Sequence, residues 1–238
     1  MGAVRQLAVV ENRYERSRTP CRKGSHICSE VVARLAEFAV PGRYPRNAIL
    51  FVEGQPSRGV FILYTGQVKL YTSSAGGKNF ILGFANPGEI LGLAGAMSGQ
   101  PHEACAEAIQ PTQASFVERK HLIQLMEHHY ELAIQVAMQL GESYCSAIAG
   151  ARLIGHSQSA SQKLATFLLD WCKSNHSMQD EGGARLSLTH EEIAQVIGTS
   201  RETVTRLLSG FKKKRLIEWK NCNLVLTNRA VLERSAAG

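Results

Sequence analysis

Between about residue 40 and residue 116, the hydrophobic positions come in short runs separated by turn residues. The runs are rich in β-branched and aromatic residues, and glycine, proline and asparagine divide them at intervals of roughly ten residues. They read AILFVEG, GVFILYTG, QVKLYTS, NFILGFA and ASFVE. Many short strands joined by glycine-rich turns predict a sandwich or barrel rather than a parallel sheet covered by helices.

After His121 the hydrophobic spacing becomes that of a helix. Apolar residues recur at every fourth position, with alanines beside them, at Leu132, Val136, Leu140, Tyr144 and Ile148. A narrow apolar stripe lined by small residues predicts a long helix that packs against its copy in a homodimer, with these five residues at the dimer interface. The alternative is a helix whose stripe is buried against its own domain.

These patterns divide the chain into four parts. Residues 1–28 are predicted to form an irregular basic extension. Residues 29–120 are predicted to form a β-rich domain, which opens with a short helix over Ser29–Phe38. The long helix lies within residues 121–157, and a polar run then separates it from a C-terminal domain at residues 158–238.

The C-terminal domain contains two predicted helices in close succession. Thr189 and Glu192 have the spacing of a capping box, which predicts a helix over His190–Val196. Ser200 caps a second helix over Arg201–Lys213, and a glycine between the two helices permits a tight turn. Two β-prone runs follow and predict a hairpin. This order of elements is typical of a winged helix-turn-helix, whose second helix enters the major groove of DNA.

The exposed N-terminal end of the second helix has side chains suited to reading bases. Arginine forms paired hydrogen bonds with guanine and glutamate accepts one from cytosine, so the predicted base-reading residues are Arg201, Glu202 and Arg206. The residues predicted at the DNA backbone share hydroxyl or ammonium groups. They are Thr189, Ser200, Thr203, Thr205, Lys212, Lys213 and Lys214. The alternative is that two helices pack together and their charged residues are merely solvated. That alternative does not explain why the caps, the glycine and the hairpin occur in this order.

Charge is distributed unevenly along the chain. The net charge of +7 comes from +5 in residues 1–46, −3 in residues 47–149 and +5 in residues 150–238. A basic C-terminal third beside an acidic middle is typical of a nucleic-acid-binding domain joined to a domain of another kind. No apolar run approaches the ~20 residues needed to cross a bilayer, and charges interrupt the N-terminal apolar patch that a signal peptide would need. We expect a cytoplasmic protein that binds double-stranded DNA and no membrane.

Three segments resemble the Crp–Fnr family of bacterial transcription regulators. THEEIAQVIGTSRETVTRLLSGFKKKRLI is similar to the family's DNA-binding segment, and is closest there to the catabolite activator members. VEGQPSRGVFILYTGQVKLY resembles the family's β-roll, and PGEILGLAG resembles its glycine-rich segment before the effector pocket. The likeness extends over nearly the whole chain beyond about residue 29.

The resemblance implies an α+β fold with three parts. These are an N-terminal β-roll sensor similar to a cyclic-nucleotide-binding jelly roll, a long dimerisation helix and a C-terminal winged helix-turn-helix. It places Arg201, Glu202 and Arg206 at the family's base-reading positions. It also implies a homodimer on an inverted repeat with TGTGA-like half-sites centred about one helical turn apart. A member that is an activator would have RNA polymerase as a further partner.

The resemblance also implies a small-molecule effector pocket in the β-roll. Its expected residues are Gly88, Glu89, Leu91, Gly92, His102, Glu103 and Ala104. Members that bind cyclic AMP have a glutamate where this chain has Leu93, and an arginine–serine pair where it has His102–Glu103. A carboxylate close to the cyclic phosphate is unfavourable, and Ala147–Ala149 in the long helix lack the hydroxyls that contact the purine. We expect an effector other than cyclic AMP, with cyclic AMP as an alternative.

Other members hold an iron–sulfur cluster through four cysteine thiolates. The nominees here are Cys21, Cys28 and Cys105, whereas Ser115 stands at the position of the fourth ligand. Two further alternatives are a haem bound through His102 and a redox-active thiol at Cys105. An unidentified small molecule and DNA binding without any ligand complete the set, so the sequence assigns no cofactor.

Three other classes of function fit parts of the pattern. A β-roll also occurs in cyclic-nucleotide-controlled kinase subunits, but these lack a winged helix. An enzyme is disfavoured because the chain has no nucleophile–base spacing, no HExxH and no GxxxxGK motif. A non-specific architectural DNA-binding protein would bind specific and random duplexes alike, which a binding assay at two salt concentrations distinguishes.

Overall fold

The structure, a computed structural model, consists of two compact units, one mainly before Ile148 and one mainly after it. It describes residues 35, 37–74, 76–155, 159–175, 184–186, 188–220 and 223–237. The predicted extension at residues 1–28, with Cys21 and Cys28, lies outside these described residues. The same holds for most of the helix predicted over Ser29–Phe38.

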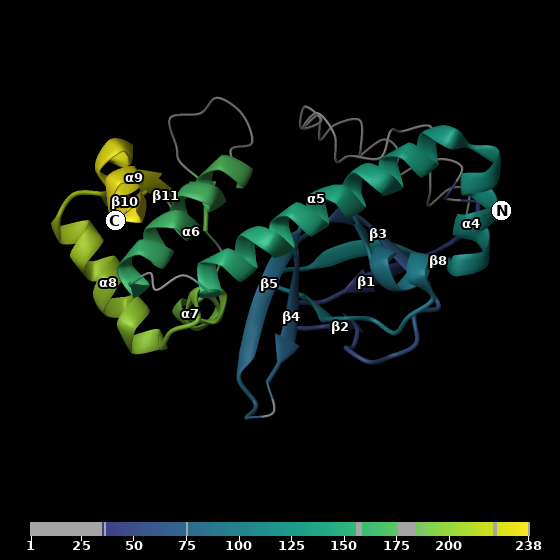
Figure 1. The fold of residues 1–238 in the computed structure, drawn as a ribbon, viewed down its shortest axis with the longest axis horizontal. Helices are drawn as coiled ribbons and strands as arrows, with labels where there is room; N and C mark the ends of the chain where they lie inside the picture. Colours follow the sequence, from purple (N-terminus) through teal and green to yellow (C-terminus); the bar gives the residue numbers. More distant parts are fainter. Residues whose placement is uncertain are drawn as a thin grey trace. The chain divides into compact units, whose positions relative to one another are not determined.

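The first unit is a β-roll built from two four-stranded sheets (Figure 1). One sheet contains, in spatial order, β1 (Ala39–Tyr44), β8 (Thr112–Glu118), β3 (Gly59–Thr65) and β6 (Ile90–Leu91). The other contains β2 (Ile49–Phe51), β7 (Cys105–Ala108), β4 (Val68–Ser73) and β5 (Asn79–Ala85). The five predicted strands are confirmed as β2 to β5 and β8. The pattern missed β1, which contains a proline and a glycine, β6, which has two residues, and β7, which has no β-branched residue.

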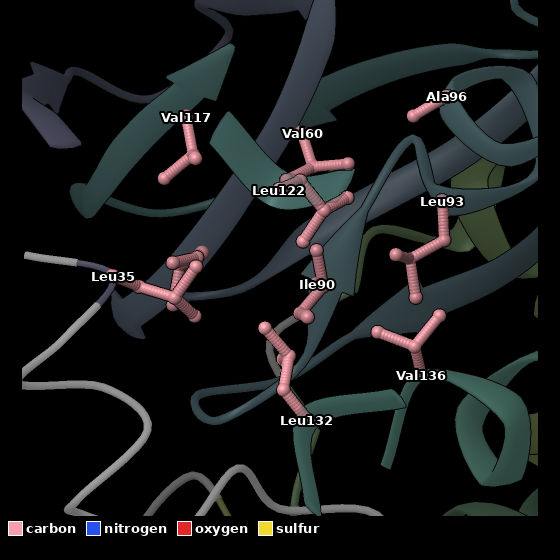
Figure 2. Close-up of a cluster of buried hydrophobic side chains, with 10 residues drawn as sticks. Leu35, Val60, Ile90, Leu93, Ala96, Val117, Leu122, Leu132 and Val136 are labelled. Atoms are coloured by element: carbon pink, nitrogen blue, oxygen red, sulfur yellow. The ribbon is translucent and has the colours of Figure 1, made fainter. Parts of the chain in front are cut away.

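One hydrophobic core is shared by the sheet of β3 and β8 and by two helices that follow it. These helices are α4 (Arg119–His128) and α5 (Tyr130–Gly155). Figure 2 shows side chains from strands and helices in one cluster, among them Val60, Val117 and Leu122, which are all 0% exposed. Complete burial of each such side chain contributes ~1.5–3 kcal/mol to stability.

The first turns of α5 belong to this core, which corrects the predicted dimer interface. Leu132 and Val136 are 1% and 2% exposed within this cluster (Figure 2). Leu140 packs against the same cluster, and the burial of Leu132 and Val136 leaves them no surface for a second copy. Tyr144 and Ile148, farther along, are 68% and 37% exposed. In a helix with 3.6 residues per turn, each residue of a four-residue repeat lies about 40° farther around the axis than the one before it. The predicted stripe therefore passes from the core side to the solvent side.

The second unit contains three helices, a small sheet and a terminal helix. In chain order these are α6 (Ala160–Asn175), β9 (Ala184–Arg185), α7 (His190–Ile197), α8 (Arg201–Lys213), β10 (Ile217–Lys220), β11 (Asn223–Leu226) and α9 (Arg229–Ala237). The sheet order is β10-β11-β9, so the predicted hairpin is present as β10 and β11. The pattern missed β9 and α9. No helix among the described residues is both long enough and apolar enough to cross a membrane.

Candidate nucleic-acid interface

A complete capping box begins α7. The Thr189 hydroxyl accepts a hydrogen bond from the backbone N–H of Glu192 at 3.1 Å. The Glu192 carboxylate in turn accepts hydrogen bonds from the Thr189 N–H at 2.8 Å and from its hydroxyl at 2.9 Å. Glu192 is buried, and its charge lies at the helix end where backbone N–H groups favour an anion. This box fixes where the first helix of the motif starts.

The turn between α7 and α8 depends on a glycine. Gly198 has a φ of 67°, in the left-handed region that favours glycine, and its N–H donates to the Ala194 carbonyl. Thr199 donates to the same carbonyl at 3.0 Å. Ala194 is 1% exposed, as a close approach of the two helices requires. The helix extends one residue beyond the predicted end at Val196, to Ile197, which is buried whereas Val196 is half-buried.

Opposite faces of α8 have opposite character. The buried side chains are Val204, Leu208 and Phe211. The exposed side chains of its N-terminal half are Arg201, Glu202, Thr205 and Arg206. Spacings of one, three and four residues place these four on one helical face. The three predicted base-reading residues are therefore brought together on a surface that no other described element covers.

The charges on this face suit contacts with bases. The pKa of Glu202 is held below its usual range because its own backbone N–H and the Ser200 hydroxyl donate hydrogen bonds to the carboxylate. Glu202 is thus ionised at neutral pH and is an acceptor only, as a contact with a cytosine amino group requires. No salt bridge joins Arg201 or Arg206 to another residue of the described chain, so both guanidinium groups are free to form paired hydrogen bonds with bases.

The predicted backbone-contact hydroxyls are engaged within the protein. Ser200 accepts from the Thr203 N–H at 3.3 Å, and the hydroxyl oxygens of Ser200 and Thr203 lie 3.1 Å apart. The Thr205 hydroxyl donates to the Arg201 carbonyl at 3.0 Å and lies 2.8 Å from Nδ1 of His190. The sequence gives no sign of the role of His190, because its partner is fifteen residues away and nothing local marks the contact. The three lysines at the end of α8, Lys212–Lys214, are exposed.

The predicted effector pocket coincides with a packed interior. Leu91 and Leu93 belong to two hydrophobic core clusters, and Gly88 and Ala104 are also buried. Leu93 begins the short helix α3 (Leu93–Ser98). A buried leucine at this position offers no hydrogen bond to a ligand, so the glutamate role implied by the resemblance is absent here.

His102 takes the place of a phosphate-binding cation and is itself buried. It is 5% exposed and stacks on Phe51 with ring centroids 4.0 Å apart. Burial lowers the pKa of His102, against a smaller opposing effect of the Glu103 charge, so the imidazole is neutral at neutral pH. Its Nδ1 has no hydrogen-bond partner among the described residues. Glu103 is exposed and Glu89 half-buried, so the Glu103 carboxylate is not enclosed in this interior.

No metal centre is formed around the cysteines in the part of the chain that the structure describes. Cys105 is buried on β7, where its sulfur accepts a hydrogen bond from the Glu53 N–H at 3.3 Å. Ser115 is buried on β8 opposite Ile62. Within the described ranges, no three histidine, cysteine, aspartate or glutamate side chains are grouped so that they could hold a metal ion.

Two family models match the chain, one over each unit. The Crp-like helix-turn-helix domain matches residues 162–235, and the cyclic nucleotide-binding domain matches residues 41–129. The first range contains α7 and α8, and the second contains most of the β-roll. The two matches follow each other in the order that the sequence resemblance implies.

Curated relatives match most of the chain. The cAMP-activated global transcriptional regulator CRP of Pasteurella multocida is 27% identical over 184 residues, which cover 74% of this chain and 84% of that protein. The CRP-like cAMP-activated global transcriptional regulator of Mycobacterium tuberculosis is 26% identical over 215 residues, covering 86% of this chain and 92% of that protein. These relatives are transcription regulators, not enzymes.

Solved structures have the same fold. FixK2 from Bradyrhizobium japonicum is 26% identical with a TM-score of 0.74, and the match covers 84% of this chain and 98% of that one. The c-di-GMP-responsive regulator CLP of Xanthomonas campestris has a TM-score of 0.72 at 20% identity, covering 84% of this chain and 100% of that one. At that identity, CLP supports the fold alone.

Proposed function

The chain belongs to the Crp–Fnr family of DNA-binding transcription regulators with a sensor domain, and on that premise we propose that it acts as a homodimer on an inverted-repeat site. The proposed half-sites are TGTGA-like and centred about one helical turn apart, so that a two-fold dimer presents one α8 to each. The protein is proposed to act on promoter DNA in the cytoplasm and, if it is an activator, to contact RNA polymerase there.

The observation that carries this proposal is the uncovered face of α8 with Arg201, Glu202 and Arg206. Two guanidinium groups and one ionised carboxylate supply the donors and acceptor that guanine and cytosine edges require in the major groove. Selection of bound sequences from a random duplex pool tests it directly. We expect a palindrome with TGTGA-like arms, and a motif without two-fold symmetry would contradict the proposal.

An exposed stripe on α5 supports the dimer. The residues of this stripe are apolar or small and lie outside the β-roll core. The spacing from one to the next is alternately four and three residues. This α5 stripe consists of Ile134, Met138, Gly141, Cys145 and Ile148. Alternate spacings of four and three are those of a two-stranded coiled coil. A Cβ at Gly141 would meet nothing within 4 Å of its own chain, so the glycine leaves room for a second helix.

The sensor domain is proposed to respond to an effector other than cyclic AMP. The neutral, buried His102 provides no cation for a phosphate, and Leu93 provides no acceptor for a ribose hydroxyl. We expect the affinity for the selected palindrome to be unchanged when cyclic AMP is titrated into the protein–DNA mixture. A saturable rise in affinity, measured by fluorescence anisotropy, would contradict this part of the proposal.

Lys213→Ala should weaken binding to specific and random duplexes by the same factor. Lys213 is exposed in the last turn of α8, away from the base-reading residues, so its charge is expected to meet a phosphate. The slope of log affinity against log salt should fall by about 0.9 for each phosphate that is no longer neutralised. Lys120→Ala removes the same charge from α4 in the first unit and serves as the control. A loss confined to the specific site would show that Lys213 reads sequence instead.

A further inference from the structure

A hydrogen bond links the start of α7 to the recognition helix α8. His190 is the first residue of α7 and is half-buried, and Thr205 lies on the exposed face of α8 among the base-reading residues. His190 Nδ1 and Thr205 Oγ1 are 2.8 Å apart. The contact joins the two helices at the surface that the proposed function assigns to DNA.

The Thr205 hydroxyl has one hydrogen and two neighbours that compete for it. Its Oγ1 lies 3.0 Å from the Arg201 carbonyl, which can only accept a hydrogen bond. Both contacts form together only when the hydroxyl donates to that carbonyl and accepts from His190. Nδ1 must therefore carry a hydrogen, as it does in one neutral tautomer of histidine and in the imidazolium.

We infer that His190 is a positioning residue of the DNA-reading surface, because its Nδ1–H holds the Thr205 hydroxyl on the Arg201 carbonyl. This inference rests on the proposed function, since it assumes that the exposed face of α8 reads DNA. It also changes the role predicted for Thr205. With its one hydrogen committed, Thr205 cannot donate to a phosphate without releasing the Arg201 carbonyl.

The hydrogen bonds from His190 to Thr205 and from Thr205 to the Arg201 carbonyl restrain the first turn of α8, and Arg201 in that turn is a predicted base-reading residue. Arg201 opens α8, and the first turn of a helix has the fewest internal hydrogen bonds to hold it. A paired contact with guanine requires the guanidinium to approach in one orientation, and a turn already held against α7 loses less freedom on binding. The hydrogen bond is thus expected to favour the specific complex more than the non-specific one.

Asparagine and glutamine distinguish the two ring nitrogens of His190. The amide nitrogen of asparagine can reach the place of Nδ1, whereas that of glutamine reaches the place of Nε2. His190→Ala in the full-length chain should weaken binding to the selected palindrome by about three- to tenfold, which is the range of one hydrogen bond. His190→Asn should recover most of that loss and His190→Gln should not. A random duplex of equal length measures the non-specific affinity.

Thr205→Val completes a double-mutant cycle. Valine has the shape of threonine without the hydroxyl, so His190→Ala should have no further effect in the Thr205→Val background. An equal loss in both backgrounds, or rescue by glutamine rather than asparagine, overturns the positioning role and indicates direct contact of Nε2 with DNA. If the wild-type chain shows no preference for the palindrome, the proposed function fails. If that preference is normal and the His190 variants bind as the wild type does, only this inference fails.

Discussion

Met138→Glu should convert the protein from a dimer to a monomer and remove its preference for the palindromic site. Met138 lies in the α5 stripe and is 45% exposed in the single chain. In a two-stranded coiled coil each seam residue lies beside its own copy, so the substitution would bring two carboxylates together in an apolar interface without a counter-charge. Because linked binding to two half-sites contributes at least about 10²-fold in affinity, a loss of that size is expected for the palindrome.

Ser143→Glu provides the matched control for this substitution. Ser143 is exposed on the same helix but about half a turn away from Met138 and Gly141, so the same charge there should leave the dimer intact. Sedimentation equilibrium at micromolar concentration gives the oligomeric state, and anisotropy with palindromic and single half-site duplexes gives the affinities. A dimeric Met138→Glu protein would contradict the assignment of the α5 stripe. A monomer that still prefers the palindrome would contradict the link between dimer and site.

The sequence predicted one long helix within residues 121–157, where the structure has α4 and then α5, and it did not predict which side of α5 is free. Leu132 and Ile148 share a sequence stripe, yet the first is 1% exposed and the second 37% exposed. The difference arises because the first turns of α5 pack on the β-roll core, whose position no local spacing encodes. The α5 stripe becomes apparent only after the residues used by that core are removed.

Features set by neighbouring residues were predicted most accurately. The bounds of α8 agree with the prediction at both ends. Its N-terminal end is set by Ser200, which accepts a hydrogen bond from the N–H of the residue three positions later. Contacts between distant residues were not predicted. The pair of His190 and Thr205 depends on how α7 and α8 cross, and the burial of His102 depends on the strand that carries Phe51.

Arg201→Ala should lower the affinity for the selected palindrome by about 1–3 kcal/mol and relax the preference at one guanine in each half-site. The expected loss is that of a paired hydrogen bond to guanine O6 and N7. Arg201→Lys keeps the charge but not the planar pair of donors, so it should recover non-specific binding and little of the base preference. Arg215→Ala, at an exposed position beyond the end of α8, removes an equal charge as the control.

A double-mutant cycle that combines Arg201→Ala with base-pair replacements in the DNA shows which base Arg201 reads. Each base pair of one half-site is replaced in turn, and the affinity of wild type and Arg201→Ala is measured by competition. At the guanine that Arg201 binds, replacement should cost the wild type ~1–3 kcal/mol and cost the variant almost nothing, because the variant has no guanidinium to pair with that base. At every other position the two proteins should respond equally. Equal costs at all positions would mean that Arg201 binds only the phosphate backbone, and that base reading falls to Glu202 and Arg206.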